Sequence, residues 1–360
     1  MTWLFALQLL RKGRDARNLG TLMTIGAFIS GCEGLSLTAR EIAFFERHNP
    51  WGLILFKRNI DTPEQITALT KHFRQITGRP DAPVLIDQEG GRVQRMGPPL
   101  WRKYPAANKY SILYDSDPLR ALKLARLITR LMAKDLLDVG INVDCLPVLD
   151  VPQPGSHQII GDRAYGVTPE RVSVLARAAV TGLMEGGVLG IIKHIPGHGR
   201  AMSDSHLSLP QVDTPYDELL HGDFLPFAAL ADIPMAMTAH VVYSAIDPDN
   251  PATMSKTIIS DIIRGRFGYN GLVMTDDLSM QALSGDFANR AAQAIAAGCD
   301  VTLHCNGNIS EGEAVAEGSG SLSSDSLVRA EQALGRCCQP LPFDKYEAEQ
   351  ALKDLMDISA

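Results

Sequence analysis

The sequence lacks a long apolar run. No stretch approaches the ~20 consecutive apolar residues of a membrane-spanning helix, so we expect no membrane partner. It also lacks a block of basic residues. Its 41 Asp and Glu residues outweigh its 34 Lys and Arg residues and give a formal net charge of -7. A nucleic-acid partner needs clustered cations that neutralise phosphates, and this composition argues against one.

Cysteine is sparse: the six residues form no CxxC pair and no framework spacing. Free thiols in a reducing compartment fit this pattern better than disulfides, and we expect a cytoplasmic protein. Residues 1–22 carry one short apolar run, Trp3 to Leu10, and its charges follow rather than precede it. This order differs from that of a secretory signal, so we interpret residues 1–22 as an N-terminal extension.

What the sequence does have is an alternation of short apolar runs with longer helical patterns. Four of the helical patterns begin with a capping residue and a proline, at Thr62-Pro63, Asp117-Pro118, Thr168-Pro169 and Thr214-Pro215. Eight apolar runs are predicted strands, at 21–28, 52–56, 83–87, 140–144, 189–194, 234–240, 271–276 and 298–304. This alternation, with no GxGxxG after the first strand, favours an α/β fold with a single (β/α)8 barrel over an open doubly wound sheet.

The domain organisation follows from the same pattern. We expect residues 23–340 to form the barrel and residues 341–360 to form a C-terminal helix packed on it. Residues 306–326 are rich in Gly, Ser and Glu, which predicts a polar loop or linker before the final helices.

Polar side chains stand at the carboxyl ends of five predicted strands. They are Asp87, Asp150, Lys193 with His194, His240, and Asp276 with Asp277. Ionisable groups are costly to bury without partners. Their occurrence at the same end of five strands is therefore hard to explain by packing of the core. Active sites of such barrels lie at the carboxyl ends of the strands, which predicts a functional site at this face.

The loop after the fifth strand carries further ionisable groups. Pro196, Gly197 and Gly199 break regular structure, and His198, Asp204 and His206 follow on the same loop. A carboxylate two residues before a histidine can accept its imidazole N–H, fixing the tautomer and supporting the charged form. A metal site built from His194, His198, His206 and Asp276 is disfavoured, since no HxH or HExxH spacing is present.

Four motifs occur in a characteristic order. They are DQEGGRVQR at 87–95, GDRAYG at 161–166, KHIPGHG at 193–199 followed four residues later by DSH at 204–206, and TDDLSM at 275–280. From about Met23 to Leu334 the sequence resembles the bacterial β-N-acetylglucosaminidases of glycoside hydrolase family 3. The resemblance implies that residues 23–340 are the catalytic domain.

The resemblance also implies a role for each motif residue. Asp276 would be the catalytic nucleophile, and His206, paired with Asp204, would be the acid and base. The substrate-binding residues would be Asp87, Arg95, Arg163, Lys193 and His194. The implied reaction is exo-hydrolysis of terminal β-linked N-acetylglucosamine with retention, without a metal or organic cofactor, by a monomer. Its implied substrate is a small muropeptide sugar of peptidoglycan recycling, N-acetylglucosamine joined to 1,6-anhydro-N-acetylmuramic acid, with or without a peptide.

Several alternatives stay open at this point. Asp277 has the residue type and position of a helix cap, and Arg92 those of an ion-pair partner in the loop after the third strand. His198 suits a structural role, and His240 can hydrogen-bond in the barrel mouth without touching sugar. The competing functions are a phosphorylase, which would use phosphate on the same glycosyl-enzyme, and a non-catalytic glycan-binding protein.

Overall fold

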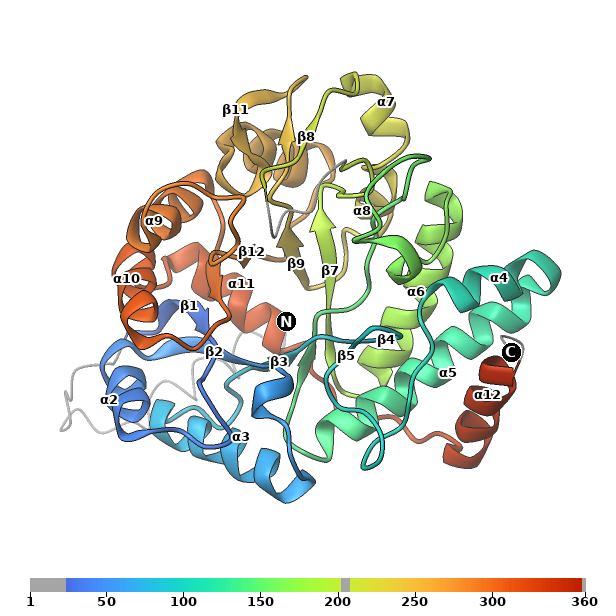
Figure 1. Ribbon diagram of the computed structural model, residues 1–360, viewed down its shortest axis with the longest axis horizontal. Helices are drawn as coiled ribbons and strands as arrows, with labels where there is room; N and C mark the ends of the chain where they lie inside the picture. The colour runs from blue at the N-terminus through green and yellow to red at the C-terminus, as the bar shows by residue number, and fades with distance from the viewer. Residues whose placement is uncertain (1–23, 202–207, 358–360) are drawn as a thin grey trace, which may run out of the picture.

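The computed structural model describes residues 24–201 and 208–357, and its centre is a closed barrel of eight parallel strands (Figure 1). The strands are β1 (Gly26–Ser30), β2 (Pro50–Leu55), β3 (Val84–Ile86), β6 (Val143–Asp144), β7 (Leu189–Ile195), β9 (Met235–Thr238), β12 (Leu272–Asp277) and β13 (Val301–His304). They neighbour one another in chain order, and β1 closes the barrel by pairing with β13, Phe28 opposite Thr302. The prediction of a single (β/α)8 barrel is confirmed.

The barrel strands are apolar on both faces because each face packs against a different apolar layer. Ile29 and Ile191 belong to the cluster that fills the barrel, whereas Phe28 and Ile192 belong to the larger cluster between strands and helices. Side chains alternate along a strand, so this assignment fixes which residues of each strand point inward.

The helices surround the barrel (Figure 1). They are α2 (Ala39–His48), α3 (Pro63–Thr77), α4 (Asn108–Ser116), α5 (Pro118–Leu137), α6 (Pro169–Glu185), α7 (Tyr216–His221), α8 (Leu225–Ala229), η4 (Ile258–Arg266), α9 (Phe287–Ala297), α10 (Ile309–Ser319), α11 (Ser324–Leu334) and α12 (Lys345–Asp357). Short strands outside the barrel form a hairpin, β4 (Gln88–Gly90) with β5 (Val93–Gln94), and a small sheet of β8 (Gln211–Val212), β10 (Val242–Tyr243) and β11 (Asp247–Pro251).

Three of the four predicted helix starts have the expected cap. The side chains of Thr62, Asp117 and Thr168 accept hydrogen bonds from backbone N–H groups in the first turns of α3, α5 and α6. The prediction at Thr214-Pro215 is wrong in detail. Pro215 itself is the N-cap of α7, and a proline side chain has no acceptor to offer.

The expectation of a polar loop or linker at 306–326 is also wrong. Asn308 caps α10 by accepting from the N–H groups of Ser310 and Glu311. The small residues suit close packing instead of flexibility: a Cβ added at Gly318 would lie 2.1 Å from the carbonyl oxygen of Ala288 in α9. Composition alone does not distinguish these two uses of glycine and serine.

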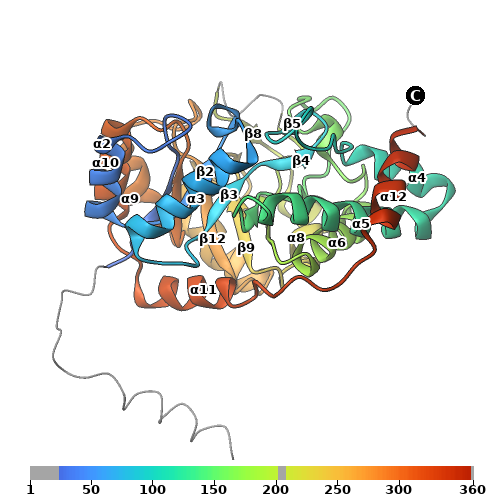
Figure 2. The ribbon, with the colours of Figure 1, turned by 90° about the horizontal axis from the view of Figure 1, so that it is seen from below.

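The C-terminal segment runs across the outside of the barrel to α5. Helix α12 buries Ala348, Ala351, Leu352 and Leu355 and lies beside α5 (Figure 2). Before it, the carbonyls of Leu341 and Pro342 accept hydrogen bonds from Arg130. In the part of the chain that the structure describes, no helix combines the length and apolar character needed to cross a membrane.

The six cysteines are free thiols, as the sequence predicts. Cys32, Cys145, Cys299 and Cys305 are buried among apolar side chains. Burial raises the pKa of Cys32 to about 12, which keeps its thiol protonated and unreactive at neutral pH.

Candidate active site

Three charged side chains reach the barrel mouth because they continue the inward-facing rows of their strands. Asp87 follows Leu85 by two residues, Lys193 follows Ile191, and Asp276 follows Met274; all three apolar residues lie in the interior cluster. The strand period of two therefore turns these polar groups to the same cavity at the carboxyl ends.

Lys193 is the centre of a buried ion cluster. Its Nζ lies 3.0 Å from Oδ1 of Asp87 and 2.7 Å from Oε1 of Glu89, and its side chain is 2% exposed. Burial alone would raise the pKa of Glu89, but Arg163 and Lys193 outweigh it and lower that pKa to about 2. Burial likewise opposes the charge on Asp87, yet Lys193 and Arg95 hold its pKa below the ordinary value. Both acids are ionised at neutral pH.

Two arginines complete the cluster from outside the barrel strands. Arg95 lies 2.9 Å from Oδ2 of Asp87, and Arg163 makes a bidentate pair with Glu89, at 2.7 and 2.8 Å. The pairing of Arg163 with Glu89 joins the loop after β6 to the β4–β5 hairpin and forms one wall of the site. A bidentate arginine pair fixes the guanidinium plane as well as its position.

A further acid lies below this cluster. Asp144 accepts the backbone N–H of Gln88 at 2.9 Å and so holds the start of the hairpin next to Asp87. Burial raises the pKa of Asp144 well above its ordinary value, against the lowering effect of the Gln88 N–H and of Lys193.

His194 is held by a buried aspartate. Its Nδ1 lies 2.7 Å from Oδ2 of Asp150, a side chain that is completely buried. Asp150 Oδ1 also accepts the backbone N–H of His198 at 2.7 Å. Burial lowers the pKa of His198 to about 4, so that imidazole is neutral at physiological pH.

Asp276 stands at the end of β12. Burial would raise its pKa, but His194 and then His240 lower it below the ordinary value, helped by the backbone N–H of Asp277, which donates to Oδ1 at 2.8 Å. The carboxylate is thus ionised and partly exposed to the cavity. An ionised carboxylate at this position is available as a nucleophile.

Neighbouring polar residues make local structural contacts. Asp277 accepts from the N–H groups of Ser279 and Cys305, and His240 contacts the Thr253 hydroxyl and the carbonyl of Asp277. Arg92 pairs with Asp162 at 2.8 Å on the exposed rim. These contacts shape the mouth around Asp276.

The cavity enclosed by these groups has a volume of about 200 Å³. Its lining includes Asp276 and the five residues predicted to bind substrate: Asp87, Arg95, Arg163, Lys193 and His194. Ile54, Met237 and Leu303 close its floor, and Phe56 and Met280 lie in its wall. Asp204 and His206 lie outside the described residues, so their predicted catalytic roles stay predictions.

Sequence reasoning assigned no role to three residues that organise this site. Glu89 stands two residues after Asp87. In an extended chain two such side chains point to the same side, so this spacing could have placed Glu89 beside Asp87. The fourth predicted strand, 140–144, leads to Asp150, but the pairing of Asp150 with His194 depends on the barrel register. Nothing in the local sequence distinguishes Phe56, which lies beside the guanidinium groups of Arg58 and Arg95.

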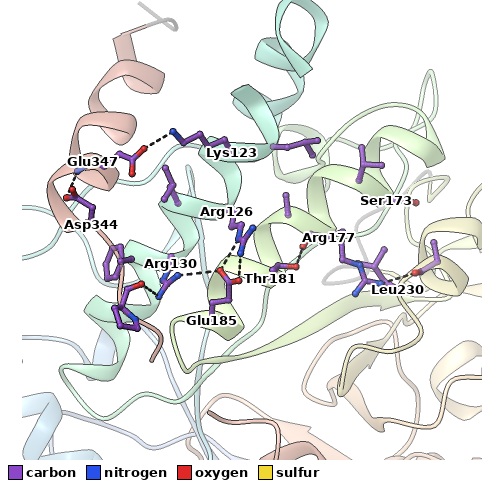
Figure 3. A pocket seen from close by; sticks show the side chains of 17 residues that line it. Lys123, Arg126, Arg130, Ser173, Arg177, Thr181, Glu185, Leu230, Asp344 and Glu347 are labelled. Carbon is purple, nitrogen blue, oxygen red and sulfur yellow. Dashed lines mark hydrogen bonds and ion pairs between the residues drawn. The ribbon is translucent and has the colours of Figure 1, made fainter. Parts of the chain in front are cut away.

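A wider groove of about 830 Å³ lies elsewhere, between α5, α6 and the C-terminal segment (Figure 3). Its charged side chains already have partners: Arg126 and Arg130 pair with Glu185, and Lys123 pairs with Glu347. It lies on the outer face of the barrel, away from the strand ends, so the smaller cavity is the candidate active site.

No group of three or more His, Cys, Asp and Glu side chains suited to a metal ion occurs within residues 24–201 and 208–357. The fold and the ionised carboxylates at its mouth define a barrel of the kind found in glycoside hydrolases. Residues 32–333 match the sequence model of the protein family described as the Glycosyl hydrolase family 3 N terminal domain. The chain belongs to glycosyl hydrolase family 3.

Individual relatives agree with this assignment. A beta-hexosaminidase of Alkalilimnicola ehrlichii is 42% identical over 288 residues, which cover 79% of this chain and 82% of the relative. One of Methylococcus capsulatus is 41% identical over 277 residues, 76% of this chain and 80% of the relative. The crystal structure of NagZ from Neisseria gonorrhoeae with N-trifluoroacetyl-D-glucosamine superposes with a TM-score of 0.84 at 30% identity, covering 92% of this chain and 98% of that one.

Proposed function

We propose that this protein is a retaining β-N-acetylhexosaminidase that removes terminal β-linked N-acetylglucosamine. The observation that carries the proposal is Asp276, an ionised carboxylate in the wall of a small cavity whose other walls carry the five predicted substrate-binding residues. The curated relatives named beta-hexosaminidase support the same activity. A cavity closed at the barrel floor admits the end of a glycan and excludes its middle, which supports exo-action.

The proposed chemistry is a double displacement. An oxygen of Asp276 attacks the anomeric carbon while the bond from that carbon to the leaving oxygen breaks, and His206 gives its proton to that oxygen. Water then attacks the anomeric carbon, His206 takes the water proton, and the bond to Asp276 breaks. Asp204 would support the charged form of His206, as a carboxylate does for a neighbouring imidazole.

The ion cluster supplies sugar recognition in this proposal. Asp87 has acceptor oxygens for sugar hydroxyls, while Arg95, Arg163 and Lys193 have donors beyond those used within the cluster. His194 presents its ring at the same wall. Because Asp87 is already held by two cations, it binds a hydroxyl without reorganising.

The motif resemblance also supports a finer proposal for the natural substrate. It is a peptidoglycan turnover product, N-acetylglucosamine linked to 1,6-anhydro-N-acetylmuramic acid with or without peptide, processed by a monomer in the cytoplasm. Neither a metal nor an organic cofactor takes part in the proposed steps.

The test is release of 4-nitrophenol from the β-N-acetylglucosaminide and the β-glucoside. We expect the wild type to hydrolyse the first, and Asp276→Ala to lower kcat by at least ~10³-fold because the nucleophile is missing. Asp138→Asn removes an exposed acid that pairs with Lys134 of α5 and does not line the cavity; it is the matched control, with a change below ~3-fold. Wild-type rates in Asp276→Ala would refute the assignment, and a rate that requires added phosphate would indicate a phosphorylase.

The acid and base assignment has a separate test. His206→Ala should lower kcat strongly for the disaccharide, whose leaving oxygen needs a proton, and much less for the 4-nitrophenyl glycoside, whose leaving group departs without one. The two substrates are compared at one pH in a single enzyme preparation. Equal losses on both would contradict a role for His206 as proton donor.

A further inference from the structure

Asp150 is a buried carboxylate whose two oxygens serve different partners. Oδ1 accepts the backbone N–H of His198 at 2.7 Å and that of His194 at 3.2 Å. Oδ2 faces Nδ1 of His194 at 2.7 Å. Burial would raise the pKa of Asp150, but His194 and His198 lower it below the ordinary value, so the group is an anion.

An anionic carboxylate can only accept hydrogen bonds, so the nitrogen that faces it must carry a hydrogen. We propose that Asp150 is a positioning residue that keeps the hydrogen of His194 on Nδ1 and turns the Nε2 edge of the ring to the sugar cavity. In the neutral ring, Nε2 is then an acceptor for a sugar hydroxyl. The inference uses the proposed function only in treating this cavity as the sugar site.

The position of the ring also matters for Asp276. In its protonated form His194 is the group whose charge most lowers the pKa of Asp276 against the effect of burial, ahead of His240. His240 is fixed by Thr253 and the carbonyl of Asp277, at 2.7 and 3.0 Å. Asp150 does the same for His194, so both imidazoles beside the nucleophile are held in place.

The substitution Asp150→Asn gives a sharp test because its orientation is determined. Two backbone N–H groups point at Oδ1, so the amide oxygen of asparagine must occupy that place. The amide NH₂ then faces Nδ1 of His194 and needs an acceptor there. The ring must therefore lose its hydrogen from Nδ1 and carry it on Nε2, which reverses the hydrogen-bonding role of the edge that faces the cavity.

The matched control is Asp300→Asn. Asp300 is also buried, and it accepts the backbone N–H of Val273 at 2.9 Å. Its carboxylate also contacts the side chains of Arg264 in η4 and of Ser326 and Arg329 in α11. Helix α11 crosses the opposite end of the barrel from the β4–β5 hairpin (Figure 2). This variant therefore perturbs a buried aspartate without touching the site.

The experiment is ¹⁵N NMR of the histidine side chains in the full-length protein, with the His194 signals identified by their absence in His194→Gln. We expect hydrogen on Nδ1 in the wild type and in Asp300→Asn, and on Nε2 in Asp150→Asn. The kcat/KM of Asp150→Asn for the 4-nitrophenyl substrate should fall at least ~10²-fold below that of Asp300→Asn.

Hydrogen retained on His194 Nδ1 in Asp150→Asn would overturn the proposal. Equal losses of kcat/KM in Asp150→Asn and Asp300→Asn would also overturn it, when the two variants unfold at the same urea concentration and so are equally stable. A wild-type protein inactive on the glycoside would refute the proposed function alone. The tautomer measurement needs no turnover, so the two failures are distinguishable.

Discussion

Glu89 shows how a single residue couples the site to the stability of the fold. Its side chain is 6% exposed and carries a charge that two buried cations neutralise. Removing one member of such a cluster leaves the others charged and desolvated, which is costly. The same contacts that place Arg163 and Lys193 in the cavity wall therefore contribute to folding.

This coupling predicts a pH-dependent loss in Glu89→Gln. The pKa of Glu89 is lowered from 4.5 to about 2, which corresponds to about 3 kcal/mol of unfolding free energy. Because the folded-state pKa lies below the unfolded value, this contribution is complete above pH ~4.5 and is lost as the pH falls toward 2. Urea unfolding from pH 7 to pH 3 should show a gap between wild type and variant that narrows below pH ~4.5.

Glu218→Gln is the control, since the exposed Glu218 side chain pairs with Arg200 at the surface and its loss should change the unfolding free energy by less than about 1 kcal/mol. A Glu89→Gln variant as stable as the wild type at pH 7 would show that the cluster contributes nothing to folding.

Sequence reasoning succeeded where chemistry follows from alternation along one strand. Asp87, Lys193 and Asp276 were predicted to share a site because each follows an apolar run, and the structure gathers them in one cavity. The pairing of Glu89 with Arg163 was not predictable, since 74 residues separate them and the contact requires a hairpin folded over the barrel mouth. Local patterns give the strand ends, and only the assembled barrel gives their partners.

At the scale of elements, the eight strands were predictable because buried parallel strands are continuous apolar runs bounded by turn residues. Helix α10 was not, because its buried face is made of Gly312, Val315, Ala316 and Ser319, which includes only one large apolar residue. Its stability comes from backbone proximity to α9, and periodicity of hydrophobicity does not report such contacts.

The packing of α10 on α9 predicts that Gly318→Ala is destabilising. The new Cβ would lie 2.1 Å from the carbonyl oxygen of Ala288, so the two helices must separate. We expect the unfolding free energy to fall by about 1–3 kcal/mol, measured by urea unfolding. Gly34→Ala, with no atom within 4 Å of the added Cβ, should not lower it, and equal effects of the two changes would contradict close packing.

At the scale of the whole molecule, α12 is an addition to the barrel. It contributes no residue to the cavity lining, and its contacts lie on α5 and on Arg102, which pairs with Glu349. The barrel and the candidate site are complete without it.

Truncation after Gln339 should therefore separate stability from activity. Loss of the buried Leu352 and Leu355 removes about 3 kcal/mol of apolar burial and lowers Tm, while kcat on the 4-nitrophenyl substrate stays within ~2-fold of wild type. Thermal unfolding and initial rates below the new Tm measure the two effects. A large fall in kcat with an unchanged Tm would place α12 in the catalytic apparatus.

The pairing of β1 with β13 has a consequence for the time at which this molecule can fold. Phe28 meets Thr302 only when the seven strands from β1 to β12 have already been made, so the sheet has two open edges until β13 is available. Contacts between residues so far apart in sequence form slowly, and exposed strand edges invite pairing with other chains. The barrel is thus closed by the last of its strands to be made.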